Sequence, residues 1–331
     1  MTKQKWEPKD INEAFFPVEL RPLFMEQSAK KDGQLTLLPE PKYTKLPRHF
    51  AVVDVEKNRP FSVVTDDYAL VTNEEAYDRA GDIMKRVFQT TTLEDMVCFN
   101  VIMPKTRSFC HIDLIHKGTD FSPWEEDKWT AFLRLTNSYN RTRLLRFELG
   151  FCRWICLNGM IFGSKSVEFS YYHTRRGIGI DRIDRFKDNI GDIRKLETDL
   201  IEKLHQLKRY HVPETEMFPI LCRAFDIQVA KNVDSKPKRV EALISFRKQI
   251  KDLTHSYFSE MGPHGYAALN VLTEYASRPE GVIAPEASMH GLQKKAGNWV
   301  DDFIASIEDR DFSFNSYLAN FRETVEVIES L

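Results

Sequence analysis

The sequence is poor in cysteine, and the lack of paired cysteines excludes two common kinds of site. Its 331 residues include five cysteines, none of them in a CxxC pair. A zinc ribbon and a thioredoxin-type redox motif both need such a pair, so neither is indicated. The cysteines stand in apolar contexts, which favours buried, reduced thiols in a cytosolic protein. They are Cys98, Cys110, Cys152, Cys156 and Cys222.

Long apolar segments are also absent. No apolar run approaches the roughly 18 residues that a membrane-spanning helix needs. The first residues, MTKQKWEPKDINEAFF, contain no apolar stretch of the kind found in a secretory signal. We therefore expect a soluble, cytoplasmic protein with no membrane partner.

The common enzyme signatures are missing as well. GIGID at residues 177–181 is too short for the GxGxxG loop that cradles a dinucleotide. No phosphate-binding loop, GxSxG elbow or HExxH pair occurs. These absences favour a binding protein over an enzyme and leave catalysis an open question.

The composition that remains is ordinary for a globular protein, with 42% hydrophobic residues, 29% charged residues and a formal net charge of −2. Strand-like segments come first and helical segments second, which predicts an α+β fold and not alternating βαβ units. We expect an antiparallel sheet with a packed helix in the N-terminal half and a mostly helical C-terminal half. The predicted parts are an N-terminal extension and linker at 1–47, a β-rich domain at 48–180, and a helical region packing on it at 181–331.

Local patterns refine this organisation. Thr72 and Glu75 form a capping box, and apolar residues at helical spacing continue to Phe88. A short helix is also predicted at 11–24. Strands are predicted at 49–55, 61–64 and 68–71. Further helices are predicted at 190–211, 215–229, 238–261, 265–277 and 292–331, with Pro213, Pro263 and Pro279 where helices stop.

Residues 134–187 are basic, with eleven Lys or Arg against four Asp or Glu, and nine aromatic residues are interleaved. Cations bind phosphates and rings stack on bases, so this mixture predicts nucleic-acid binding, with single-stranded DNA as the expected ligand. The alternative is that the rings face the core while the arginines are solvated. The predicted contacts are Arg141, Arg143, Arg153, Arg175, Arg176 and Tyr139.

The stretch HIDLIH suggests a second kind of site. His111 and Asp113 would share one face of a strand, and His116 would lie opposite unless a bulge intervened. A divalent metal needs at least a third ligand, for which His173 is the distant candidate. The alternative is a set of polar residues near a hairpin.

The stretch RWICLNGM at 153–160 places polar residues in an apolar run. We interpret it as a central strand followed by a turn at Asn158-Gly159, residues that tolerate positive φ. Apolar neighbours favour Cys156 as a buried structural thiol over a nucleophile. Arg153 and Asn158 are then expected to meet Asn137 and His173 in one site.

An ordered series of motifs carries a family resemblance. It consists of SVVTDDYALVTNEEAY at 62–77, NSYNR at 137–141, RWICLNGM at 153–160, YHT at 172–174 and GYAALNVLTEYASR at 265–278. Over about residues 48–300 the chain resembles the phage- and plasmid-associated domain-of-unknown-function family 932. That family usually has Gly-Ser where this chain has Arg141-Thr142, and an arginine where it has Tyr172.

The resemblance implies a gene carried by mobile elements and leaves three functions open. The first is an accessory protein that binds nucleic acid in recombination, replication or counter-defence. The second is a hydrolase of nucleic acid or nucleotides, with a divalent metal as one option. There His173 would act as acid or base and Asn158 would position the substrate, with Asn137 and Ser138 in the pocket. The third is an interaction module whose helical half inhibits a host defence complex. A homo-oligomer is a further expectation.

Overall fold

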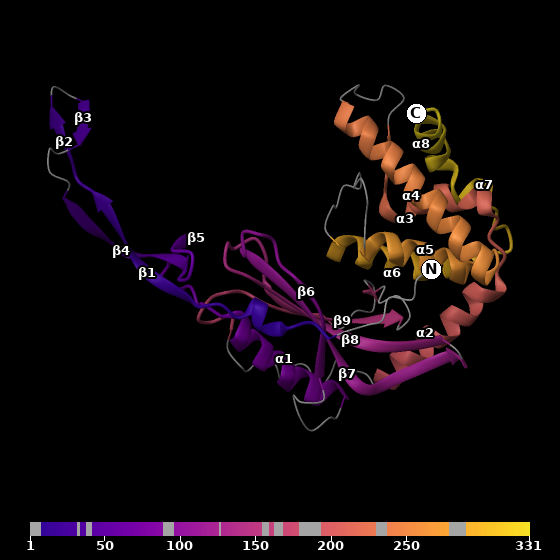
Figure 1. Cartoon of the computed structure of the whole chain (residues 1–331), viewed down its shortest axis with the longest axis horizontal. Coiled ribbons are helices and arrows are strands. Elements are labelled where there is room, and N and C mark those ends of the chain that lie inside the picture. Colours follow the sequence, from indigo (N-terminus) through magenta and orange to yellow (C-terminus); the bar gives the residue numbers. More distant parts are fainter. Residues whose placement is uncertain are drawn as a thin grey trace.

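The computed structural model in Figure 1 has strands on one side of the molecule and helices on the other. It describes residues 8–31, 34–37, 42–88, 96–125, 127–153, 159–161, 168–178, 193–229, 237–277 and 289–331. Antiparallel sheets occupy the N-terminal half and helices the C-terminal half, which confirms the predicted α+β fold. No helix in these ranges is long and apolar enough to cross a membrane.

A six-stranded sheet forms the centre of the molecule, in the order β10-β9-β8-β7-β6 with β11 also paired to β9. Its strands are β6 Met96–Ile102, β7 Phe109–Trp124, β8 Asp127–Ser138, β9 Leu145–Arg153, β10 Gly159–Met160 and β11 Glu168–Tyr171. The register sets Arg134 opposite both Asp113 and Glu148, so these three side chains share one face. Neighbouring positions such as Leu133 supply an apolar opposite face.

Helix α1 (Asn73–Phe88) covers part of the apolar face and buries Ala80 and Ile83 in one cluster with Leu133. Its start confirms the predicted capping box. The Glu75 N–H donates to Thr72 Oγ1 at 3.1 Å, and the Thr72 N–H donates to Glu75 Oε2 at 2.8 Å. The two otherwise unpaired donors of the first turn are thereby satisfied.

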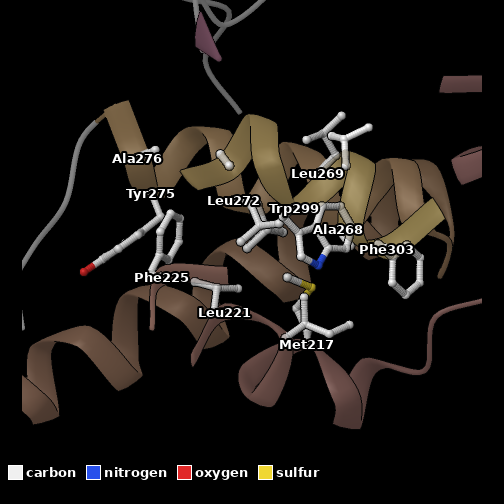
Figure 2. Packing of buried hydrophobic residues seen from close by; sticks show 14 of the residues in the cluster. Met217, Leu221, Phe225, Ala268, Leu269, Leu272, Tyr275, Ala276, Trp299 and Phe303 are labelled. Atoms are coloured by element: carbon white, nitrogen blue, oxygen red, sulfur yellow. The ribbon is translucent and has the colours of Figure 1, made fainter. Parts of the chain in front are cut away.

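The helical half is organised around α5, which is buried along almost its whole length. Figure 2 shows Leu221 and Phe225 of α3 and Trp299 and Phe303 of α6 packed around it. The long helix predicted at 292–331 is instead three helices, α6 to α8. The helices are α2 Ile193–Arg209, α3 Met217–Phe225, α4 Pro237–Met261, α5 Gly265–Ser277, α6 Met289–Ile307, α7 Phe314–Tyr317 and α8 Ala319–Glu329.

A narrow β-arm extends away from the body at the indigo end of Figure 1. It contains the three-stranded sheet β1-β4-β5 and the separate hairpin β2-β3. The arm overturns the predicted helix at 11–24, because only the 3-10 helix η1 (Ile11–Ala14) is helical there. Edge strand β1 tolerates Pro22, which lacks a backbone N–H. The strands are β1 Val18–Glu26, β2 Ser28–Lys31, β3 Gln34–Leu37, β4 Tyr43–Asp54 and β5 Arg59–Thr65.

The structure also decides two smaller predictions from the sequence, a strand and the burial of the cysteines. The predicted strand at 68–71 is wrong, because Tyr68 makes only an isolated bridge to Thr174. The prediction of buried thiols is confirmed for Cys98, Cys110, Cys152 and Cys222. Cys156 lies outside the described residues.

Candidate nucleic-acid interface

The polar face of the central sheet carries charged side chains that are paired within the protein. Arg134, which is 0% exposed, donates two hydrogen bonds of 2.6 Å to Asp113 and a third of 2.6 Å to Gln293 of α6. The His111 ring stacks on His290 with centroids 5.7 Å apart. Arg134 and nearby cations add to burial in lowering the pKa of His111 to about 2 and of His290 to about 3.

This arrangement replaces the predicted metal site. His111 and Asp113 lie on one face of β7, as the strand pattern predicts. However, His111 Nδ1 is 2.7 Å from Thr136 Oγ1, and Asp113 is the counter-ion of Arg134. The side chain of His116 is not among those described. Within the described ranges, no three His, Cys, Asp or Glu residues gather closely enough to hold a metal ion.

The motif residues Asn137 and Tyr139 are structural. Asn137 Nδ2 donates to the Val71 carbonyl at 3.0 Å and to Asn73 Oδ1 at 2.9 Å. The Asn73 N–H in turn donates to the Tyr139 hydroxyl at 2.9 Å. Tyr139 is only 1% exposed, so it has no face for a nucleic-acid base and drops out of the predicted contacts. These bonds attach the start of α1 to the end of β8.

Arg153 also drops out of the predicted contacts. It is 9% exposed, and its Nε donates to Asp127 Oδ1 at 2.6 Å. A second bond of 3.1 Å reaches Asn270 Oδ1 on α5, and the Tyr266 hydroxyl also donates to Asp127. Arg153 therefore ties the central sheet to the helical half. Asn158, its expected neighbour, lies outside the described residues. Arg153 and Asn137 each bond other side chains, so these two do not meet in the predicted four-residue site.

A cavity of about 520 Å³ lies elsewhere, where β5, the loop after it and two later loops meet. Its wall includes the stacked rings of Tyr68 and His173, whose centroids are 5.6 Å apart and whose planes differ by 15°. Tyr172, which is 62% exposed, also lines it. The lining residues are His49, Val63, Val64, Thr65, Asp67, Tyr68, Arg141, Arg143, Leu144, Tyr172, His173 and Thr174.

Backbone hydrogen bonds hold two of the cavity loops together. The Ala69 N–H donates to the His173 carbonyl at 3.2 Å, and the Arg175 N–H donates to the Asp67 carbonyl at 3.0 Å. Gly177 closes the second loop, since a Cβ there would lie 2.6 Å from the Tyr172 carbonyl oxygen. The wall is therefore fixed by main-chain contacts before any ligand binds, which lowers the entropy lost on binding.

Arg141 reaches the cavity from a strained backbone position. Its φ is +63°, in the left-handed region that favours glycine. The Asn140 carboxamide supports the turn by accepting from the Thr142 N–H at 3.2 Å and the Thr142 hydroxyl at 2.6 Å. A left-handed turn favours glycine, which is the residue that the family resemblance implies at this position. This chain has Arg141 there instead, which places a guanidinium at the cavity.

Arg143 is held by a different contact, with its guanidinium carbon 4.4 Å from the centre of the Phe109 ring. Ser138 fixes its backbone, because the Ser138 hydroxyl donates to the Arg143 carbonyl at 2.8 Å and accepts from its N–H at 3.1 Å. Burial lowers the pKa of the Arg143 guanidinium, and nearby Arg146 lowers it further. An anion beside Arg143 would oppose both effects.

Polar atoms in the cavity wall lack partners within the protein. Among the described residues, no group meets hydrogen-bond geometry with the His173 ring nitrogens or the Tyr68 hydroxyl, although the Ala69 backbone lies near enough to the His173 ring to raise its pKa. Burial lowers the pKa of His173, so its ring is neutral at pH 7, and raises the pKa of Tyr68 to about 12. Within the described part of the chain, neither Arg141 nor Arg143 forms an ion pair with a carboxylate.

The cavity thus unites three residues predicted from sequence, His173, Arg141 and Arg143. Arg175 and Arg176 follow on the exposed side of the same loop. Sequence reasoning missed His49, Asp67 and Tyr68 as site residues. The signal for the last two was present, because both belong to the motif at 62–77 that carries part of the family resemblance.

The fold and this cavity define an α+β protein whose motifs converge partly on a basic, aromatic pocket. The family model for the domain of unknown function DUF932 matches residues 60–296. The chain therefore belongs to this family, as its motif series predicts. No curated protein and no solved structure matches the chain.

Proposed function

We propose that this protein binds single-stranded nucleic acid, with DNA as the expected ligand, across the mouth of the cavity. The observation that carries the proposal is the combination of an exposed aromatic ring with two arginines that pair with no carboxylate in the described part of the chain. Arg141 and Arg143 line the same cavity as Tyr172. Phosphates need cations that are not already neutralised, and bases need an accessible ring face.

The surrounding loop extends the basic surface. Arg175 and Arg176 follow directly after the cavity residues and are exposed. Two acidic residues lie nearby: Asp66 is bound by Arg48 at 2.7 Å, and Asp67 lines the cavity itself. A strand leaving the cavity along this loop would therefore meet further cations, which favours a path for a phosphate backbone.

Single strands are favoured over duplexes because of where the aromatic residue lies. A ring such as Tyr172 can stack on a base only when that base is exposed, and in a duplex the base faces are covered by their neighbours. Binding is also favoured over hydrolysis. A catalytic histidine is normally oriented by a second group, and neither ring nitrogen of His173 has a hydrogen-bond partner in the protein.

The proposal is tested by fluorescence anisotropy with labelled single-stranded and double-stranded DNA of one sequence across a salt series. We expect tighter binding of the single strand and a linear fall of log affinity with log salt concentration. Tyr172→Ala and Arg143→Ala are each expected to weaken binding about tenfold.

Matched controls separate the cavity from general surface effects. Tyr43 on the β-arm is also 62% exposed, so Tyr43→Ala removes an equally accessible ring away from the cavity. Arg239→Ala removes an exposed cation from α4. Both controls should bind like the unmodified protein. Absence of single-strand binding at low salt, or equal losses in the controls and the cavity variants, would overturn the proposal.

The family resemblance suggests a biological setting for such binding. A single-strand binder encoded by a mobile element would serve recombination, replication or counter-defence, where single strands are exposed. The resemblance to a family associated with phages and plasmids supports this setting.

A further inference from the structure

We infer that the cavity binds the terminal phosphate of a single strand, a phosphomonoester that is close to doubly negative, between Arg141 and Arg143. This inference rests on the proposed function and adds the chemical class of group that the cavity itself takes. The rest of the strand would leave over the loop that carries Arg175 and Arg176. A phosphate within the strand differs from this ligand, because it is a diester with one negative charge.

The two arginines that line the cavity are accessible, and the protein sets the position of each. Arg141 is exposed and Arg143 is half-buried. Arg141 Nη1 donates to the Val63 carbonyl of β5 at 3.4 Å, which holds this guanidinium against the wall and uses one of its five N–H donors. The Arg143 guanidinium lies over the Phe109 ring, a contact that orients it without a carboxylate. Both cations are therefore in place before an anion binds.

The carboxylates near the cavity have cations of their own. Asp67 lines the cavity and Asp66 precedes it. Arg48 binds Asp66 at 2.7 Å, and Asp66 and, more weakly, Asp67 raise the pKa of Arg48. Arg48, through its hydrogen bond, and Arg175 both lower the pKa of Asp66. Arg48 and Arg175 thus balance the two carboxylates, so the positive charges of the two lining arginines remain for a ligand.

A phosphomonoester matches these two remaining charges. At pH 7 a terminal phosphate carries a charge of about −1.5 to −2 and presents three acceptor oxygens. A diester within the strand carries a single charge and would leave one guanidinium without an anion. A dianion beside Arg143 would also oppose the burial and the Arg146 charge that lower the pKa of its guanidinium.

Neutral hydroxyl groups and the size of the cavity agree with this ligand. Thr65 is exposed in the wall and Thr174 is half-buried there. The Gly177 N–H donates to Thr174 Oγ1 at 3.0 Å, which occupies an acceptor site of the hydroxyl and leaves its O–H able to donate. The volume of about 520 Å³ lies within the range of small-molecule sites, about 300–1,000 Å³. The terminal sugar can therefore enter with the phosphate, and the exposed Tyr172 ring lines the same cavity for the base.

Versions of one internally labelled DNA strand test the inference in the full-length protein by fluorescence anisotropy at constant salt. One version carries a 5′-phosphate, another a 3′-phosphate, another hydroxyls at both ends, and the last is closed into a circle. A phosphate at the end that the cavity accepts should tighten binding about tenfold relative to the hydroxyl-ended strand, and the circle should bind no more tightly than that strand. A hydroxyl-ended strand with one more nucleotide adds a diester instead, and should gain much less than tenfold.

Two variants assign the preference to the cavity. Arg141→Gln and Arg143→Gln each remove one charge and keep a polar side chain, and thermal melting checks that both fold. Each should reduce the preference for the phosphorylated strand, and the double variant should abolish it. Arg176→Gln is the matched control, because Arg176 is an exposed cation of the exit loop outside the cavity wall. It should weaken phosphorylated and hydroxyl-ended strands alike and leave their ratio near tenfold.

The outcomes separate this inference from the proposed function. A preference for either phosphorylated end supports the inference and identifies the end. Equal binding of phosphorylated and hydroxyl-ended strands, or a preference that the double variant retains, overturns capture of a terminal phosphate and leaves single-strand binding standing. Failure of every strand to bind overturns the proposed function. Calorimetry with free deoxynucleoside monophosphates then decides the cavity alone. Heat that disappears in the double variant would retain the cavity as a phosphomonoester site, and no heat would overturn it.

Discussion

Arg153 and His173 lie in neighbouring motifs of one family signature, yet the protein treats their polar atoms in opposite ways. Arg153 is bonded to Asp127 and Asn270 and ties the sheet to the helices. His173 lies in a cavity wall with neither ring nitrogen bonded. Both side chains are largely buried, so exposure does not distinguish them. The difference is whether the protein itself supplies a partner.

This comparison separates two reasons for a polar residue to occupy a buried position. Where the partner is internal, as for Arg153, removing the residue lowers the stability of the fold. Where no described group bonds the polar atoms, as for the His173 ring, those atoms add no hydrogen bond to the fold. Motif residues of the first kind report on architecture.

The largest expected effect is on the paired side. Arg153→Met should lower the free energy of unfolding by about 3–5 kcal/mol, because it leaves Asp127 buried without its cation. Chemical denaturation measures the change. Arg143→Met, by contrast, should leave stability within about 1 kcal/mol and weaken nucleic-acid binding, since Arg143 forms no ion pair with a carboxylate of the described residues.

A double variant shows whether the loss comes from the unpaired charge. Arg153→Met combined with Asp127→Leu removes both members of the pair and should recover much of the stability lost in the single variant. If Arg153→Met alone unfolds no more easily than the unmodified protein, the ion pair does not stabilise the fold. The contrast drawn between Arg153 and His173 would then be wrong.

The second effect concerns pH and the His111–His290 stack. Their pKa values are about 2 and about 3 in the folded protein, against about 6.5 in the unfolded chain. Below pH 6.5 the unfolded chain binds protons that the folded protein does not. Stability is therefore complete above about pH 6.5 and falls with pH, by about 2 kcal/mol for each histidine at pH 5.

Denaturation at pH 7 and at pH 5 measures this dependence. His290→Gln should remove about one proton from the difference and flatten the pH profile, whereas His255→Gln, on the exposed face of α4, should not. Glu148 Oε2 lies 3.4 Å from His290 Nδ1 and favours the protonated ring, whereas burial and the surrounding cations favour the neutral one. An unchanged profile in His290→Gln would mean that the carboxylate prevails and that His290 is protonated in the folded protein.

Sequence patterns predicted the parts of the fold that depend on neighbours along the chain. The capping box of α1 and the bounds of α5 are examples, because both arise from residues within a few positions of each other. Segment 11–24 was predicted wrongly as a helix. There the pairing of β1 with β4 overrides local preference, and that pairing joins residues far apart in sequence.

At the candidate site, too, the sequence could not predict contacts between residues that lie far apart along the chain. The basic, aromatic composition of 134–187 singled out Arg141 and Arg143, which line one cavity with His173. Composition could not show that Tyr139 and Arg153 turn inward, because their partners Asn73 and Asn270 lie 66 and 117 positions away. Nor could it supply Tyr68, whose ring meets His173 only in the fold.

The smallest expected effect, and the sharpest contrast, is at Arg141. Arg141→Gly should raise the free energy of unfolding by up to about 1 kcal/mol, because glycine adopts a φ of +63° without strain. The same change should weaken single-strand binding and reduce the magnitude of the salt slope by about 0.7, the contribution of one phosphate contact. Arg239→Gly on α4 is the matched control and should lower stability without changing the slope. A variant that gains stability while losing affinity would show that strain at the cavity is retained for binding. If both quantities stay unchanged, the guanidinium of Arg141 makes no contact with the strand.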